Sequence, residues 1–254
     1  MIFRTLALAL PVALAATTAS ATTSDYLYLF GFDTSATAYS GTGSGTATNT
    51  GTTIVTDATR GSVASFDGSS YVTVNENVSE GAMATMSWGG WFNASAGTRY
   101  HGVLSADNGG FDRLMGIDTR GNPGRDPAWA AFNGSGVQDI TSMTLDTWVH
   151  LVATYDGSKV QLFANGVLAS EVTESWTAGT SMLSYFTIGA NAVHNEYFTG
   201  LADDVFLFDR TLGESEVKSI YDNGFTTPAV PLPAGLPLLI AGLGGLAALR
   251  RRKG

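Results

Sequence analysis

The chain has 254 residues, no cysteine, and little charge, with only 14% Asp, Glu, Lys and Arg. Without cysteine there can be no disulfide scaffold, no thiolate zinc site and no cysteine nucleophile. Basic residues are also scarce, since 13 Lys and Arg face 22 Asp and Glu to give a formal charge of −9. Nucleic-acid binding needs Lys and Arg to neutralise phosphates, so we expect no nucleic-acid partner.

Two catalytic or metal signatures are missing as well. The three histidines lack the spacing to His, Asp or Glu that zinc sites use. No Gly-x-Ser-x-Gly elbow occurs, which leaves a serine hydrolase without support.

The N-terminal residues 1–21 have the layout of a secretory signal. Arg4 supplies the basic start, an apolar run extends from Leu6 to Ala16, and Ala19-Ser20-Ala21 has the small-x-small pattern of a signal-peptidase site. A membrane helix is the weaker interpretation because the run is short. We therefore expect export.

The C-terminal residues 227–254 have the layout of an anchor. An apolar stretch from Leu238 to Leu249 is followed by a basic tail, which the positive-inside rule places in the cytoplasm. The segment resembles the PEP-CTERM type of sorting signal in its VPLPA variant. That resemblance implies processing by an exosortase-like membrane protease and delivery to the cell surface or extracellular matrix. A plain single-pass anchor is the alternative. The sorting motif comprises Val230, Pro231, Leu232, Pro233 and Ala234.

Removing both ends makes the remaining body strongly acidic. Eight basic residues stay with all 22 acidic ones, a formal charge of −14. Such a surface suits solubility and divalent cations, and it repels anionic membranes and nucleic acid.

The body, residues 22–226, reads as one all-β domain. Short β-branched and aromatic runs alternate with Gly, Asn, Asp and Ser, a pattern that favours a β-sandwich. Asn165-Gly166 between two runs predicts a type I′ hairpin turn. The segment Thr34–Thr53 reads as a flexible loop. The expected strands are Tyr26–Phe32, Ser62–Phe66, Tyr71–Val74, Met86–Phe92, Gly102–Ser105, Leu114–Ile117, Ala128–Phe132, Trp148–Tyr155, Val160–Ala164, Val167–Ser170, Ser184–Ile188 and Asp203–Phe208.

One short helix is expected near the end of the body, from Glu214 to Asp222. Val217, Ile220 and Tyr221 would form its apolar face. Gly213 is the expected N-cap, with Glu216 three residues on.

Three stretches together resemble a known superfamily. They are Ala64–Val72, Trp148–Gly166 and Phe198–Leu212, supported by Trp88–Phe92 and Thr187–Ala190. In this order they resemble laminin-G-like domains of the concanavalin A-like lectin/glucanase superfamily. The resemblance implies a jelly-roll sandwich of two antiparallel sheets.

The enzymatic branch of that superfamily carries a Glu-x-Asp-x-x-Glu strand whose carboxylates attack and protonate the glycosidic bond. This sequence has no such strand, so we expect a protein that is not an enzyme.

Asp203-Asp204 is the expected metal site, because in related sandwiches an acidic residue of this motif helps to hold a structural calcium. Calcium takes six to eight oxygen ligands, and carboxylates and loop carbonyls supply them. Strand alternation predicts that Asp203 points to the packed side with Val205 and Leu207. A salt bridge or a backbone hydrogen bond is the alternative.

The polar region from Asn93 to Gly136 is the expected ligand-binding rim. Sugar recognition combines an aromatic platform with planar hydrogen-bonding groups. The alternative is that Trp129 belongs to the core and the charges only solvate loops. The candidate ligand-binding residues are Arg99, Tyr100, Asn108, Asp118, Arg120, Trp129 and Trp176.

The sequence therefore predicts an exported, non-catalytic surface or matrix protein that binds an extracellular polysaccharide or a surface protein. A structural or adhesive matrix component without a small ligand, and a divergent glycoside hydrolase, remain the alternatives.

Overall fold

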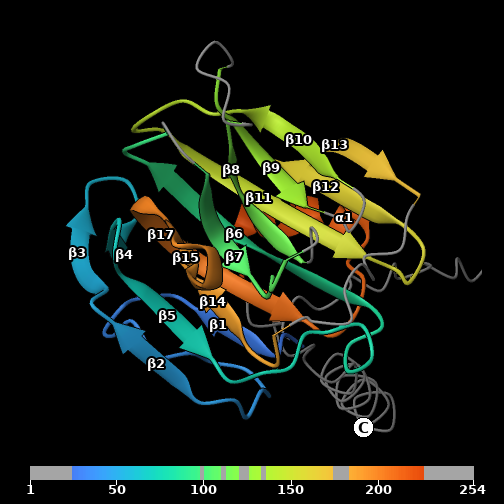
Figure 1. The fold of residues 1–254 in the computed structure, drawn as a ribbon, viewed down its shortest axis with the longest axis horizontal. Coiled ribbons are helices and arrows are strands. Elements are labelled where there is room, and N and C mark those ends of the chain that lie inside the picture. Colours follow the sequence, from blue (N-terminus) through green and yellow to red (C-terminus); the bar gives the residue numbers. More distant parts are fainter. Residues whose placement is uncertain are drawn as a thin grey trace, which may run out of the picture.

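The computed structural model describes residues 25–97, 100–109, 113–119, 126–132, 136–173 and 183–225. Within them the chain is almost entirely β-structure, with one α-helix and one short 3-10 helix (Figure 1). The strands are β1 Tyr28–Phe30, β2 Ala47–Thr50, β3 Thr53–Asp57, β4 Gly61–Asp67, β5 Tyr71–Val74, β6 Met86–Ala94, β7 His101–Ser105, β8 Leu114–Asp118, β9 Ala128–Phe132, β10 Val137–Ser142, β11 Trp148–Tyr155, β12 Val160–Ala164, β13 Val167–Val172, β14 Phe186–Ile188, β15 Ala190–Asn191, β16 Glu196–Tyr197 and β17 Thr199–Phe208. The helices are η1 Ala192–His194 and α1 Glu214–Asn223.

The strands form two sheets. The first has the order β13-β12-β11-β6-β17-β4-β3, with β1 added against β17. The second has the order β10-β9-β8-β7-β14-β5-β2, with β16 against β7 and β15. The neighbours are antiparallel, apart from a single parallel bridge between β16 and β7. This confirms the predicted all-β architecture of two antiparallel sheets with one short C-terminal helix.

The main core lies between the sheets and follows from the alternation of side chains along each strand. In β11, Val149, Leu151 and Ala153 belong to this core, whereas His150 and Val152 face the other way. In the second sheet, Met115 and Ala131 point into the same core. The two sheets thus bury one face each against the other.

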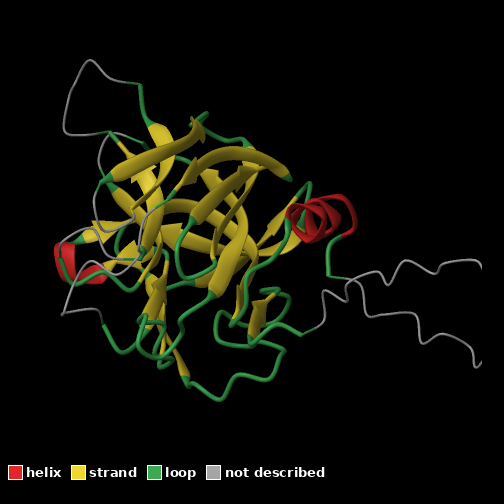
Figure 2. Ribbon diagram, turned by 90° about the vertical axis from the view of Figure 1, so that its right-hand side faces the viewer, coloured by secondary structure: helices red, strands yellow, loops and turns green. Residues whose placement is uncertain are grey.

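A second, smaller core lies outside the first sheet, beneath α1. Val217 and Ile220 of the helix pack against Val152, Phe163 and Phe206 of the sheet. The helix begins where predicted, because the Gly213 N–H donates to the Glu216 side chain at 2.9 Å. Figure 2 shows α1 and η1 on opposite sides of the strands.

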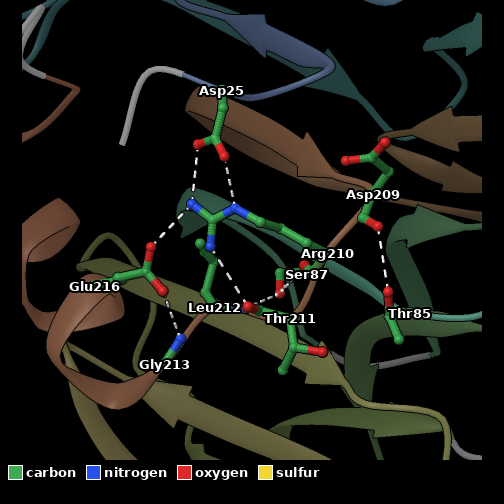
Figure 3. A network of polar contacts seen from close by, with 9 residues as sticks. All are labelled: Asp25, Thr85, Ser87, Asp209, Arg210, Thr211, Leu212, Gly213 and Glu216. Atoms are coloured by element: carbon green, nitrogen blue, oxygen red, sulfur yellow. Dashed lines mark hydrogen bonds and ion pairs between the residues drawn. The ribbon is translucent and has the colours of Figure 1, made fainter. Parts of the chain in front are cut away.

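One arginine connects three parts of the chain near α1 (Figure 3). Arg210 donates two hydrogen bonds to the Asp25 carboxylate, at 2.7 and 2.9 Å, and its Nη2 lies 2.8 Å from Glu216 Oε1. Since Glu216 also caps the helix, Arg210 ties the chain before β1, the end of β17 and the start of α1 together.

The turn at Asn165-Gly166 has the predicted conformation. Both residues have positive φ, 49° and 76°, as a type I′ turn between β12 and β13 requires. The loop predicted for Thr34–Thr53 is wrong in its second half, because Ala47–Thr50 pairs with β5 along its whole length. The threonines there are β-branched, which favours an edge strand. The prediction gave more weight to the neighbouring glycines, which are typical of loops.

The predicted signal, residues 1–21, and the predicted sorting segment, residues 227–254, lie outside the described residues. Among the described residues, no helix has both the length and the apolarity needed to cross a membrane.

Candidate functional site

A cleft opens on the face of the second sheet that is turned away from the core. Leu114 and Phe132 are paired across β8 and β9, one residue out of phase with the core residues Met115 and Ala131. With Val137 of β10 they form its apolar wall, and the whole cleft encloses about 260 Å³. We call it the outer cleft. Its other lining side chains are Tyr100, Asp107, His194 and Glu196.

The polar wall of the outer cleft is organised by Asn191 of β15. Its amide nitrogen donates to Asp107 Oδ2 at 2.8 Å and to Glu196 Oε2 at 2.9 Å. The other oxygen of Asp107 accepts from the Gly109 N–H at 2.7 Å. His194 of η1 brings Nε2 to 3.7 Å from Asp107 Oδ2. Two carboxylates from distant parts of the chain therefore meet at one buried amide.

Burial raises the pKa of the Glu196 carboxyl, opposed by the hydrogen bond from Asn191 and the nearby His194 and reinforced by Asp107. Neither Asp107 nor Glu196 forms an ion pair with a described lysine or arginine. The cleft thus combines apolar, partly aromatic lining side chains with hydrogen-bond acceptors. Pockets that bind small polar ligands commonly have this composition.

Of the ligand-binding residues predicted from the sequence, some lie at the outer cleft and others do not. Tyr100 lines the outer cleft, and Asn108 is exposed between Asp107 and Gly109 at its margin. Asp118 is fully buried at the end of β8. Trp129 is 1% exposed and packs against Phe92 and Phe198, so its ring is not available as a platform. The candidates Arg99, Arg120 and Trp176 lie outside the described residues.

Asn191, His194 and Glu196 were not among the residues selected from the sequence. They stand about 85 residues after Asp107. Asn191 and Glu196 lie on strands of only two residues and His194 ends the short helix η1, so no local motif marks them. The available signal was the grouping of Asn191, His194 and Glu196 within six residues, shortly after the expected strand ending at Ile188.

The carboxylates expected to hold calcium are instead paired with an arginine. Arg60 Nε lies 2.7 Å from Asp203 Oδ2, and Arg60 Nη2 lies 2.7 Å from Asp204 Oδ2. The guanidinium also stacks over the Trp91 ring, with its carbon 4.4 Å from the ring centroid. Burial, reinforced by Asp204 and opposed by Arg60, raises the pKa of Asp203 to about 6.

Asp203 does not share the packed side with Val205 and Leu207, as alternation predicted. Asp204 has φ of 46°, and the pairing of β17 with β6 shifts between Asp203 and Phe206. This β-bulge turns Asp203 to the outer face opposite Trp91, while Val205 and Leu207 stay in the main core. A bulge cannot be read from strand alternation.

As they stand, Asp203 and Asp204 do not fit a calcium ion. The guanidinium of Arg60 already supplies the positive charge that both carboxylates face. In the part of the chain that the structure describes, no group of three or more His, Cys, Asp or Glu side chains is placed to hold a metal. The pair is an ion-paired structural element in this conformation.

A protein-family comparison agrees with the two-sheet fold. Residues 66–218 match the model of the concanavalin A-like lectin/glucanases superfamily. The chain belongs to this superfamily. The match covers β5 to the first half of α1 and includes every described residue that lines the outer cleft. No match was found among curated protein sequences.

Solved structures of domains from other proteins share the fold. Domain 4 of AbnA, a GH43 extracellular arabinanase from Geobacillus stearothermophilus, in complex with arabinotriose, is 19% identical with a TM-score of 0.60; the alignment covers 78% of this chain and 98% of that domain. The binding domain of botulinum neurotoxin DC, in complex with rat synaptotagmin II, is 15% identical with a TM-score of 0.59. The binding domain of Paraclostridial mosquitocidal protein 1 is 14% identical with a TM-score of 0.58.

The alignments to the two toxin domains cover 80% of this chain and about half of each toxin domain, 52% and 53%. At these identities the likeness is one of fold. One similar structure holds an oligosaccharide and another holds a protein, so the fold serves both kinds of ligand.

Proposed function

We propose that this chain is an exported, non-catalytic binding module that recognises carbohydrate in the outer cleft. The observation that carries this proposal is the pairing of an apolar wall, Leu114 and Phe132, with the acceptor wall of Asp107 and Glu196. Sugar rings present C–H faces to apolar and aromatic side chains and hydroxyls to fixed polar groups. The arabinotriose complex of the similar arabinanase domain supports a sugar over a protein ligand.

The cleft is better suited to binding than to catalysis. Hydrolysis of a glycosidic bond needs two carboxyl groups free to act on opposite sides of that bond. Asp107 and Glu196 are instead both held by the same Asn191 amide and lie on one wall. The proposal therefore assigns them a recognition role.

The cellular setting is proposed from the two ends of the chain. Residues 1–21 would direct export. The VPLPA motif, Val230 to Ala234, would direct processing by an exosortase-like protease and display on the cell surface or in the matrix. Exchanging Pro231 and Pro233 for alanine in the producing organism should keep the chain uncleaved in the membrane fraction, as judged by fractionation and intact mass. Normal release of that variant would contradict the assignment.

A glycan array tests the binding function. The full chain is applied beside the variant Tyr100→Ala, which removes a ring from the outer cleft. Tyr185→Ala, which removes a ring outside the cleft, is the matched control. We expect saturable binding of a glycan class by the wild type and by Tyr185→Ala, weakened about 10-fold in Tyr100→Ala. A silent array for all three proteins would contradict the proposal and favour the structural matrix role.

A further inference from the structure

The polar wall of the outer cleft consists of carboxylate hydrogen-bond acceptors that form no ion pair with a lysine or arginine among the described residues. Asp107 is 9% exposed and Glu196 is half-buried, and both carboxylates accept from one Asn191 nitrogen. Asn191 is itself 1% exposed, and its amide oxygen accepts no hydrogen bond from the described residues. A buried acceptor without a donor costs free energy. Asp107 and Glu196 do line the cleft and can only accept hydrogen bonds when ionised, so this end of the cleft favours a ligand that brings donors.

The negative charge of the two carboxylates restricts the class of ligand further. Two carboxylates drawn out of water repel one another, and a cation placed against them would lower that energy. His194 is the group nearest to supplying one, and its Nε2 is 3.7 Å from Asp107 Oδ2, beyond hydrogen-bond distance. An acidic sugar would add a third negative charge to the same wall. The free ammonium of an amino sugar would bring one positive charge and three donors to the carboxylates, and that group has no acceptor.

The apolar wall indicates that the ligand carries its cation on a sugar ring. Leu114, Phe132 and Val137 offer apolar surface in the same cavity of about 260 Å³ that the carboxylates line. This volume is at the small end of ligand pockets and suits a single sugar residue. A bare metal ion or a simple amine would leave the apolar wall uncovered.

We propose that the outer cleft binds an amino sugar whose nitrogen is a free ammonium, with Asp107 and Glu196 as the residues that select it. The ring would lie against the apolar wall, and the ammonium would donate to the two carboxylates. The selection rests on the proposed carbohydrate-binding function and goes further, because it excludes N-acetylated and acidic sugars as preferred ligands.

Calorimetric titration of the full chain at pH 7 and 150 mM salt tests this selection. The titrants are a short β-1,4-linked glucosamine oligomer, its fully N-acetylated counterpart, and a uronic-acid oligomer of equal length. We expect the glucosamine oligomer to bind at least about 10-fold more tightly than the acetylated one, and the uronate not to bind. Tri-lysine serves as a cation without a sugar and should not compete.

Three variants assign any preference to the cleft. Asp107→Asn and Glu196→Gln keep shape and remove charge, so each should abolish the preference for the free amine. If Asp107→Asn fails to fold, as judged by circular dichroism, Glu196→Gln still decides. Glu171→Gln removes an exposed charge from β13 in the other sheet and should leave binding unchanged.

The outcomes separate the two proposals. Equal or tighter binding of the acetylated or acidic oligomer, weakened by Tyr100→Ala, would overturn the selection and uphold the binding function. Glucosamine binding that survives both Asp107→Asn and Glu196→Gln would reveal non-specific attraction to an acidic protein, which also overturns the selection. Failure of every sugar to bind would overturn both.

Discussion

At the scale of single residues, His150 shows how burial converts a titratable group into a source of pH dependence. The ring is 1% exposed between Trp91, Phe206 and Tyr221, and neither nitrogen has a hydrogen-bond partner among the described residues. Burial, reinforced by the nearby charge of Arg60, lowers the pKa of His150 to about 3. The unfolded chain would bind a proton below about pH 6.5, whereas the folded chain would not.

We therefore expect His150 to destabilise the fold as pH falls from 6.5 towards 3. Between pH 7.5 and 5.5 the wild type should lose about 1.4 kcal/mol relative to His150→Phe, which keeps an aromatic ring and cannot be protonated. Urea unfolding of both proteins at the two pH values measures this difference. An identical pH dependence for the two proteins would show that His150 is solvated or paired.

Arg60 compensates the two carboxylates at the β17 bulge. Arg60→Met should cost about 2 kcal/mol at pH 8, because Asp203 and Asp204 would then repel each other partly buried. The raised pKa of Asp203, about 6, means that the folded chain takes up a proton before the unfolded one as pH falls. The loss of stability in Arg60→Met should accordingly be smaller at pH 5 than at pH 8. Arg60→Lys should lose less stability than Arg60→Met at both pH values. A loss that does not change with pH would contradict the ion-pair account.

At the scale of elements, the β12–β13 turn helps to position α1. Gly166 has φ of 76°, and a Cβ there would lie 3.0 Å from Tyr221 of the helix. Gly166→Ala should cost about 2 kcal/mol, from the unfavourable φ and the displacement of Tyr221. Gly61→Ala is the matched control, since Gly61 has φ of 80° and open space around its Cβ position. Equal losses in the two variants would show that the contact with Tyr221 is unimportant.

The Arg210 network fixes the start of α1. The Arg210 guanidinium lowers the pKa of Asp25 through its hydrogen bonds. Arg210→Met should cost about 1 kcal/mol, a modest value because both partners are partly exposed. Hydrogen exchange should accelerate in the first turn of the helix. Lys218→Met, which breaks only the exposed Lys218–Asp222 pair, should leave that turn protected.

The elements differ in how far the sequence determines them. Strands such as β11 carry core residues at every second position, and Asn165-Gly166 has one favoured geometry, so both could be predicted. The bulge at Asp204 and the strand β2 could not be, because each depends on a partner strand far along the chain. The outer cleft could not be predicted for the same reason, since Asp107 and Glu196 meet only through Asn191 in the folded chain. Tyr100 was found because it stands in a polar segment of the predicted rim.

At the scale of the whole molecule, the outer faces of the two sheets have different roles. The first sheet covers its outer face with α1 and the second core, which stabilise the fold. The second sheet carries the outer cleft on its outer face, and His194 of η1 is one of the residues that line the cleft. The formal charge of −14 on the body between residues 21 and 227 attracts cations and repels acidic polymers over distances of about 8 Å at physiological salt.

The most direct test of this account is a crystal structure of the full chain with the glycan that binds best on the array. The account predicts density for a sugar residue in the outer cleft, with its ring against Leu114 and Phe132 and its polar groups within hydrogen-bond distance of Asp107 and Glu196. Density for the sugar at any other surface, with the outer cleft holding none, would contradict the central claim.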